Sequence, residues 1–326
     1  MKSVMRNHSA VTMFFILGLT RDPQLEILVF TFLFITYTFC VLGNLTIISL
    51  IFIDSHLKTA MYFLLQNFSF LEISLTMACV PAYLYIISSG NKVVTIKACF
   101  IQVFFVILFG ATEFFLLAVM SYDRCVAICK PLHYVTIMNS RVCRNLILCC
   151  WTSGLLIIIP PLGLSLNLEF CDSVIDHFVC DASPILKNSC TDTWFIEQLA
   201  ILCAVLTLIV TLMCVVLSYM YIIRTVLRLP SSQQRKKVFS TCSSHMIVVS
   251  ISYGSCIFMY INPSAKNVIS INKAVFLLIV SVAPLLNPFI YTQRNKQVKQ
   301  SFHDILKRLV FLSKKYYIFI LEITLK

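Results

Sequence analysis

Seven apolar stretches, each long enough to cross a membrane, constrain this chain more than any other feature. A membrane-spanning helix needs about 20 mostly apolar residues. The stretches run approximately over Leu25–Ile53, Met61–Ser88, Ile96–Met120, Val142–Leu166, Trp194–Ile223, Val238–Ile261 and Ile271–Tyr291. Because lipid cannot satisfy backbone hydrogen-bonding groups, each stretch is expected to be a helix. The predicted fold class is an all-α membrane protein, a seven-helix transmembrane bundle with a short amphipathic cytoplasmic helix after the seventh span.

The composition supports a membrane protein and excludes several other classes. Apolar residues make up 59% of the chain and charged residues 12%, whereas a soluble domain averages about 45–50% apolar and about 25% charged. Membrane lipid is therefore an expected partner, and nucleic acid is not. A transporter would predict an internal repeat, which the sequence lacks. An intramembrane enzyme is also disfavoured, because His245 has no evident catalytic partner and no metal-binding His-Glu-x-x-His motif occurs.

The distribution of charge predicts the orientation of the bundle. Eight of the 26 Lys and Arg residues fall on the side of the N-terminus, together with eight acidic residues, and the other 18 fall on the opposite side. Since cytoplasmic loops are enriched in Lys and Arg, we expect a multi-pass protein of the cell membrane with its N-terminus outside and its C-terminus in the cytoplasm. The predicted regions are an extracellular tail (1–24), the helical bundle (25–291) and a cytoplasmic tail (292–326).

Four of the 15 cysteines fall on the predicted outer side. Cys171, Cys180 and Cys190 lie in the polar loop after the fourth stretch, and Cys99 lies at the outer end of the third. In an oxidising compartment these residues predict two disulfides, and the residues alone leave all three pairings open. Free thiols are a weaker interpretation, and zinc binding is weaker still. Asn7 begins an Asn-His-Ser sequon in the outer tail and is the predicted glycosylation acceptor.

Two acidic residues, Glu72 and Glu113, fall in the middle of the second and third stretches. A charge at the bilayer centre costs roughly 2.5–3.5 kcal/mol, so such residues suggest a function. One interpretation is a cation site, or a protonated carboxyl bonded to the other carboxylate. The other interpretation is a pair of neutral carboxyls that make interhelical hydrogen bonds. The sequence does not choose between them.

Asp123 and Arg124 end the third stretch at the predicted cytoplasmic side. An arginine there can hold Asp123 and polar groups of the sixth stretch and later release them, so we predict an ion-pair latch with two states. The pair belongs to a longer run of residues, Met120–Tyr134, which makes it more specific than an isolated Asp-Arg dipeptide.

Several sequence motifs occur in the order in which the olfactory receptors have them. The chain therefore resembles this branch of the rhodopsin-like G-protein-coupled receptors. These motifs are Phe15–Thr20, Gly43-Asn44, Met61–Leu64, Met120–Tyr134, Lys237–His245, Pro284–Tyr291 and Arg294–Lys296. The resemblance covers nearly the whole chain. It implies a receptor without enzymatic activity or cofactor, which binds a small volatile odorant and activates a heterotrimeric stimulatory G protein to raise cyclic AMP. The alternative is a non-olfactory rhodopsin-like receptor for another small apolar ligand.

The resemblance also implies roles for individual residues. Cys99–Cys180 and Cys171–Cys190 would be the two disulfides, and Glu72 with Glu113 would match an acidic pair that holds sodium in the inactive state. The residues that resemble the family's activation switch are Asp123, Arg124, Tyr219, Asn287, Pro288 and Tyr291. Proline in the seventh span has a physical reason, because it interrupts the backbone hydrogen bonds and lets the helix end move.

By the same resemblance, the ligand pocket lies between spans three, five, six and seven. The residues expected to face it are Val106, Ile107, Gly110, Ala111, Cys203, Thr207, Tyr253, Cys256, Ile257, Tyr260, Leu277 and Val280. Helix packing is an equally good interpretation for any single one of them. None carries a fixed charge, so an amine or carboxylate would lack a partner, and a neutral ligand with one hydrogen-bonding group is expected. Thr207, Tyr253 and Tyr260 could supply that hydrogen bond.

Overall fold

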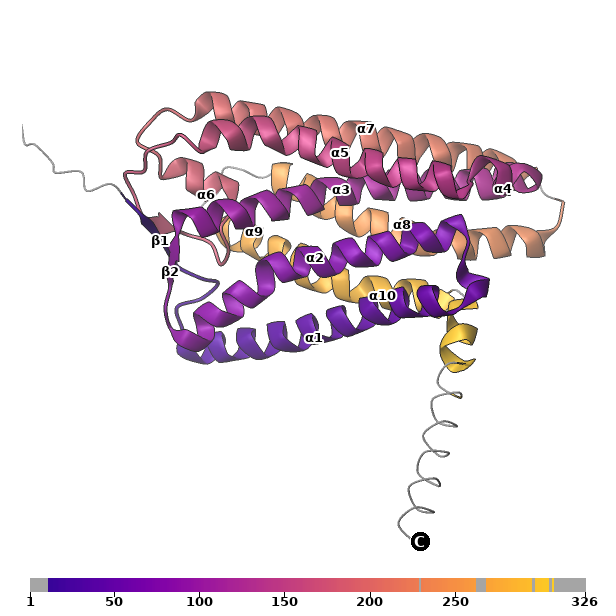
Figure 1. Cartoon of the computed structure of the whole chain (residues 1–326), viewed down its shortest axis with the longest axis horizontal. Helices are drawn as coiled ribbons and strands as arrows, with labels where there is room; N and C mark the ends of the chain where they lie inside the picture. Colours follow the sequence, from indigo (N-terminus) through magenta and orange to yellow (C-terminus); the bar gives the residue numbers. More distant parts are fainter. Residues whose placement is uncertain (1–10, 229, 262–267, 295–296, 305–306, 308–326) are drawn as a thin grey trace, which may run out of the picture.

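The computed structural model describes residues 11–228, 230–261, 268–294, 297–304 and 307, with side chains except at residues 237, 241, 260–261, 268–270 and 291–294. In this part of the chain, seven helical spans are long and apolar enough to cross a membrane. They comprise α1 (Pro23–Ile53), α2 (Ala60–Ser89), α3 (Ile96–Cys129), α5 (Ser140–Ser165), α7 (Trp194–Leu227), α8 (Ser232–Ile261) and the unit α9 (Val268–Leu277), η3 (Leu278–Val282) and α10 (Ala283–Arg294). The predicted fold class is confirmed (Figure 1).

Short elements connect the spans at both ends of the bundle. The turns η1 (Ser55–Leu57) and η2 (Pro131–His133) and the short helix α4 (Tyr134–Ile137) lie at one end, and α6 (Ala182–Lys187) lies at the other. Residues 297–304 are also helical and follow α10. Within the bundle, α3 packs against α2, α5 and α7, while α1 packs against α2 and α10.

Polar caps set the starts of three spans. The Asp22 side chain accepts from the Gln24 N–H before α1, Thr95 accepts from Ala98 before α3, and Asn139 caps α5. Each cap satisfies backbone N–H groups that have no partner inside the helix. Several spans are longer than predicted: α3 continues to Cys129, α7 to Leu227, and α8 already begins at Ser232. Hydropathy locates only the hydrocarbon-embedded part of a helix, so these polar extensions were missed.

The seventh span is one predicted helix, but the structure interrupts it with the π-helical segment η3 (Leu278–Val282). Pro284 and Pro288 explain the loosened backbone bonding, because neither has an N–H to donate to the carbonyl four residues earlier. Other helices use the freed carbonyls: Thr76 donates to Val280 O at 3.2 Å, and Asn44 donates to Pro284 O at 3.2 Å. The carbonyls that the prolines leave free therefore accept the hydrogen bonds that join this span to α1 and α2.

The region predicted as an N-terminal tail contains a strand. The strand β1 (Met13–Ile16) lies between β2 (Val93–Thr95), which is antiparallel to it, and β3 (Val174–Ile175), which is parallel. Its side chains alternate between exposed and buried, and Phe14 and Ile16 are almost fully buried. This small sheet covers one end of the bundle (Figure 1). The pairing partners come from distant loops, so the sequence did not predict the strand.

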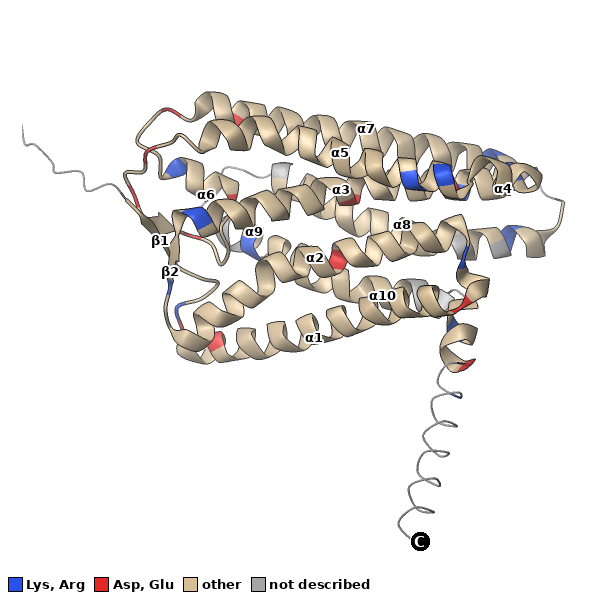
Figure 2. Cartoon of the chain, viewed as in Figure 1, with Lys and Arg blue, Asp and Glu red and all other residues tan. Residues whose placement is uncertain are grey.

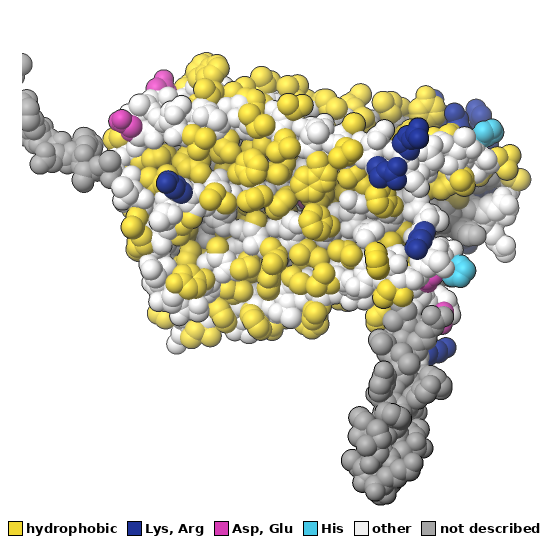
Figure 3. Space-filling model, in the orientation of Figure 1, with side chains coloured by type: hydrophobic (Ala, Val, Ile, Leu, Met, Phe, Trp, Pro, Cys, Tyr) yellow, Lys and Arg dark blue, Asp and Glu magenta, His cyan; other side chains and the backbone are white. Residues whose placement is uncertain are grey.

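The surface of the bundle has the distribution that a membrane requires. Hydrophobic side chains cover its long side in Figure 3, and many large ones are exposed, such as Phe34, Leu156 and Val210. Patches this extensive are rare on soluble proteins. Figure 2 places the basic residues mostly at the end that holds α4 and the acidic residues of the loops at the end that holds β1.

Candidate functional site

Two disulfides fasten the loop after α5 over the end of the bundle that holds β1. Cys99 in the first turn of α3 is joined to Cys180, and Cys171 is joined to Cys190 within the loop. Of the three pairings that the sequence left open, this is the one that the resemblance implied. The Cys180 N–H also donates to Oε1 of Gln102 in α3 at 2.9 Å. The loop is thus anchored to α3 both covalently and by a hydrogen bond.

Below this anchor, aromatic rings form the underside of the loop. The His177 ring stacks on Phe178 at 4.8 Å and meets the edge of Phe276 at 5.1 Å. His177 is only 7% exposed. Burial lowers the pKa of His177 below 6.5, nearby Lys273 acts in the same direction, and Asp181 opposes both. The imidazole is therefore neutral near pH 7, consistent with its place among apolar rings.

The predicted ligand residues divide between two packing clusters. Val106 and Ile107 of α3 pack with Leu277 and Val280 in an outer cluster that also contains Phe178. Tyr253 and Cys256 of α8 belong to an inner cluster with Phe114 of α3, whose ring centroid lies 4.9 Å from that of Tyr253. The predicted α8 residues therefore pack in a different layer from the predicted residues of the α9–η3 unit, and α3 contributes side chains to both layers.

The remaining predicted ligand residues differ in their fit. On α3, Gly110 has open space where a Cβ would stand, and its neighbour Ala111 is partly buried. On α7, Thr207 is buried and already donates to Cys203 O at 2.7 Å. Ile257 does not fit the predicted inward face, because it is 39% exposed. Successive helical residues are rotated by about 100°, so Ile257 lies off the face of Cys256. The Tyr260 side chain lies outside the described part.

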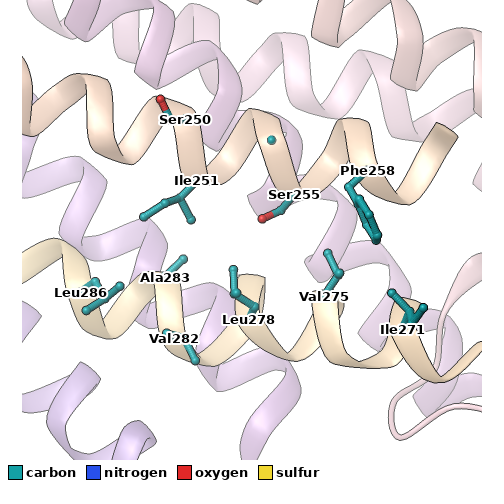
Figure 4. A pocket seen from close by; sticks show the side chains of 11 residues that line it. Ser250, Ile251, Ser255, Phe258, Ile271, Val275, Leu278, Val282, Ala283 and Leu286 are labelled. Carbon is teal, nitrogen blue, oxygen red and sulfur yellow. The ribbon is translucent and has the colours of Figure 1, made fainter. Parts of the chain in front are cut away.

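Two pockets stand out among the described residues, and none of the predicted ligand residues lines either of them. The larger, about 450 Å³, lies between α8 and the α9–η3–α10 unit. In Figure 4, Ile251 of α8 points toward Ala283 across it, and Phe258 points toward Val275 and Ile271. The smaller, about 220 Å³, lies between α2 and α3 beneath Phe178. The pocket between α3, α7, α8 and α9 therefore stays a prediction.

One buried polar atom favours Tyr253 as a ligand-binding residue. Its side chain is 3% exposed, and its hydroxyl lies beside Thr211 but has no partner in hydrogen-bonding geometry within the described residues. A buried hydroxyl left unpaired costs about 1–3 kcal/mol. A ligand that bonded to this hydroxyl would recover part of that cost.

The two mid-membrane acids have separate partners. Glu72 of α2 accepts a hydrogen bond from Asn287 of α10, and Glu113 of α3 accepts one from Ser252 of α8 at 2.9 Å. Each carboxyl thus joins two helices by a hydrogen bond. The described residues contain no group of three or more His, Cys, Asp and Glu that could hold a metal ion.

The predicted latch has a different geometry. Asp123 is 2% exposed and forms no ion pair with Arg124 in the described part; it accepts from the Tyr134 hydroxyl at 2.8 Å instead. Burial and the neighbouring Asp123 raise the pKa of Tyr134, so its hydroxyl stays protonated and donates. Nη1 of Arg124 contacts Sδ of Met61 in α2 at 2.9 Å. The prediction was wrong on this point, because adjacent helical residues face different neighbours.

His245 of α8, for which the sequence offered no partner, joins three helices. Its Nε2 lies 3.2 Å from Leu117 O of α3, and its Nδ1 lies 2.9 Å from the Tyr219 hydroxyl of α7. Because a carbonyl only accepts, Nε2 carries the proton and Nδ1 accepts from Tyr219. His245 is fully buried. The sequence marked His245 only as part of the run Lys237–His245, which carries the family resemblance. That run did not predict which groups His245 contacts.

Comparison with known proteins assigns the chain to a family. A family model described as olfactory receptor matches residues 32–309. The chain belongs to the olfactory receptor family. Human olfactory receptor 6C2 is 68% identical to it over 312 residues, which cover 95% of this chain and 100% of that protein. Human olfactory receptors 6C68 and 6C3 are 64% and 59% identical, with the same shares covered.

Membership of this family makes the chain a G-protein-coupled receptor rather than an enzyme, and the seven apolar helices make it a multi-pass membrane protein. Of the predicted switch residues, Pro288 in α10 lies against α1, where a Cβ built on Gly43 would stand 3.2 Å from its ring. Tyr291 belongs to α10, but its side chain lies outside the described part, as does the whole of Asn7. The predicted glycosylation therefore stays a prediction.

Proposed function

We propose that this olfactory receptor binds a small neutral volatile between α3, α7, α8 and α9 and then activates a heterotrimeric stimulatory G protein, which raises cyclic AMP. The observation that carries the proposal is the junction of His245 with Tyr219 and Leu117 O. It joins α3, α7 and α8 on the inner side of Tyr253. Tyr253 lies eight residues from His245 on the same helix, about two turns away. A ligand at Tyr253 can therefore act on the junction through one rigid helix.

The ligand class follows from the chemistry of the predicted lining. Val106, Ile107, Leu277 and Val280 offer only hydrocarbon, and the unpartnered Tyr253 hydroxyl offers one hydrogen bond. Pockets for small molecules combine an apolar lining with a few polar groups that orient the ligand. We therefore expect a neutral molecule with one acceptor or donor. Open space at Gly110 leaves room for its body.

Activation requires the ligand to bind the active and inactive states with different affinity. A shift of α8 would open the His245 junction and separate the inner ends of α3, α7 and α8. Asp123 would leave Tyr134 and Arg124 would leave Met61, so that both could take new partners. The basic residues Arg224 and Arg235 at the ends of α7 and α8 would then help to bind the G protein.

The proposed orientation places β1 outside the cell and the helix 297–304 in the cytoplasm. The two disulfides support it, because disulfides persist on oxidising sides of membranes. The excess of Lys and Arg at the other end supports it independently. In this orientation residues 1–24 are extracellular, 25–291 form the receptor bundle, and 292–326 are cytoplasmic, which keeps the predicted regions.

A sodium ion in the inactive state is a further part of the proposal. Glu72 and Glu113 would hold it, with the hydroxyl of Ser252 close to Glu113. These are hard oxygen donors, which suit such a cation. Its single positive charge would offset one of the two carboxylate charges. Without the ion, the carboxyls are satisfied by Asn287 and Ser252, so the bundle does not depend on it for hydrogen bonding.

The proposed function is tested by measuring cyclic AMP in cells that express the receptor with the olfactory stimulatory G protein. A panel of neutral volatiles is applied to the wild type, Arg124→Ala and Tyr253→Phe, and the surface level of each is measured. We expect a volatile that activates the wild type, no response from Arg124→Ala, and a weaker response from Tyr253→Phe. An equal response from Arg124→Ala at equal surface level would contradict the proposed coupling.

A further inference from the structure

An ion pair between a buried lysine and a half-exposed aspartate lies on the side of the bundle that holds the predicted ligand pocket. Lys273 in the first turns of α9 is 8% exposed, and its Nζ donates to Asp176 Oδ1 at 2.8 Å and to Gly18 O at 3.0 Å. Lysine is rarely this buried unless it is paired. The three partners come from α9, from the loop after α5 and from the segment after β1, so one ammonium group joins three distant parts of the chain.

The partners continue into the wall above the pocket. Asp176 directly precedes His177 and Phe178, the rings that form the underside of the loop. Gly18 donates its N–H to His177 O at 3.0 Å, and it adopts a positive φ of 85° that suits glycine. Lys273 stands one helical turn from Leu277, a predicted ligand residue. Releasing Lys273 would therefore loosen the roof of the predicted pocket and not only the surface.

The two sides of the loop are held by different kinds of bond. On the α3 side, Cys180 is bonded covalently to Cys99. On the α9 side, four residues earlier in the loop, the hold is the ion pair of Asp176 with Lys273. A disulfide does not open on the timescale of ligand exchange, whereas an ion pair with a half-exposed carboxylate does. This asymmetry is the geometry of a lid with a fixed hinge and a releasable catch.

We propose that Lys273, Asp176 and Gly18 form a clasp that gates the ligand pocket. When the clasp opens, the Gly18 N–H also releases His177 O. The segment with His177 and Phe178 then swings about the Cys99–Cys180 bond and exposes the space between the loop and α9 to the outside. A neutral volatile enters and leaves through this opening. The inference rests on the proposed ligand site, but the clasp itself can be tested without any ligand.

The test is the rate at which an outside reagent reaches a thiol under the lid. Leu277→Cys is introduced into the whole receptor in cells, and the probe is a small, positively charged methanethiosulfonate that does not cross membranes. The same chain with Leu277 unchanged gives the background from the native cysteines. The clasp variants are Lys273→Met and Asp176→Ala, and Lys273→Arg is the conservative variant that retains the ion pair.

The chain offers a matched control at the same end of the bundle. Lys92 pairs with Glu26 at 2.9 Å and so joins the segment before β2 to α1 rather than to the loop after α5. Lys92→Met removes the same charge from the same side of the receptor. Its labelling rate of Leu277→Cys includes the effect of a lost positive charge on the cationic probe, and it is therefore the reference for Lys273→Met.

We expect Lys273→Met and Asp176→Ala to raise the labelling rate several-fold over Lys92→Met, and Lys273→Arg to match the unmodified clasp. Equal rates in Lys273→Met, Asp176→Ala and Lys92→Met would overturn the proposal. If Lys273→Met does not reach the cell surface, Asp176→Ala alone decides the test. The Asp176 side chain is half-exposed, so its removal disturbs folding less. Labelling needs neither odorant nor G protein, so failure of the clasp and failure of the proposed function remain distinguishable.

Discussion

Gly154 of α5 lies directly against Thr112 of α3: a Cβ built on Gly154 would stand 2.6 Å from the Thr112 hydroxyl oxygen. The approach allows two membrane-spanning helices to pack at close range, as small residues do in membranes. Thr112 is buried, and its hydroxyl has no hydrogen-bond partner within the described residues. The contact is therefore one of fit rather than of hydrogen bonding.

Gly154→Ala should destabilise the bundle by about 1–3 kcal/mol, because overpacking a close helix contact forces backbone or side-chain shifts. The measurement is thermal unfolding of the receptor in detergent. Gly163→Ala is the matched control on the same helix, since a Cβ there meets nothing within 4 Å. Adding Thr112→Ala should rescue Gly154→Ala, because it removes the atom that clashes. If Thr112→Ala does not restore stability, the contact with the Thr112 hydroxyl is not the cause of the destabilisation.

Tyr134→Phe should raise the basal cyclic AMP signal, because it removes the hydroxyl that holds Asp123. A hydrogen bond to a charged group is worth about 1.5–3 kcal/mol, so a measurable shift toward the active state is expected. The readout is cyclic AMP without odorant at matched surface level. Tyr122→Phe, an exposed position next to Asp123, is the control and should not change the signal. A basal level equal in both variants would argue against Tyr134 as a restraint.

Tyr219 and His245 should be energetically coupled, since the Tyr219 hydroxyl donates to Nδ1 of His245. In a double-mutant cycle of Tyr219→Phe and His245→Phe, residues in contact typically give an interaction energy of about 0.5–3 kcal/mol. The cycle is measured by thermal unfolding of the four receptors. Strictly additive losses would mean that this hydrogen bond does not stabilise the inactive bundle.

His177 should make the stability of the receptor depend on pH. Burial lowers its pKa below the ordinary 6.5, so the folded chain binds fewer protons than the unfolded one below that pH. The stabilisation is complete above pH 6.5 and is lost as the pH falls toward the folded pKa, and each pKa unit corresponds to about 1.36 kcal/mol. Thermal unfolding of the wild type and His177→Phe from pH 7.5 to 5 measures it. His133→Phe, in the exposed turn η2, is the control.

In that experiment the wild type should lose stability faster than His177→Phe as the medium is acidified, and His133→Phe should follow the wild type. Parallel curves for the wild type and His177→Phe would contradict the neutral, buried state of this ring. Phenylalanine is a suitable replacement because Phe178 and Phe276 surround the site with aromatic edges and faces.

The sequence by itself determined the number of spans, the family and the cysteines that form disulfides. These depend on composition over about 20 residues or on uninterrupted motifs, which are local properties. The bounds of α3, α7 and α8 and the break at η3 were missed, because polar helix ends and a π-helical turn leave no mark in hydropathy.

Tertiary structure alone decided the partners of the polar groups. In the sequence, Lys273 is one of eight basic residues on the predicted outer side. In the structure, it is buried and bonded to Asp176 and Gly18. His245 had no evident partner in the sequence, and Asp123 was assigned to Arg124 rather than to Tyr134. Hydrogen bonds act over about 3 Å, and the groups that meet at that range come from different helices and loops. Only the packing of those helices determines which groups meet.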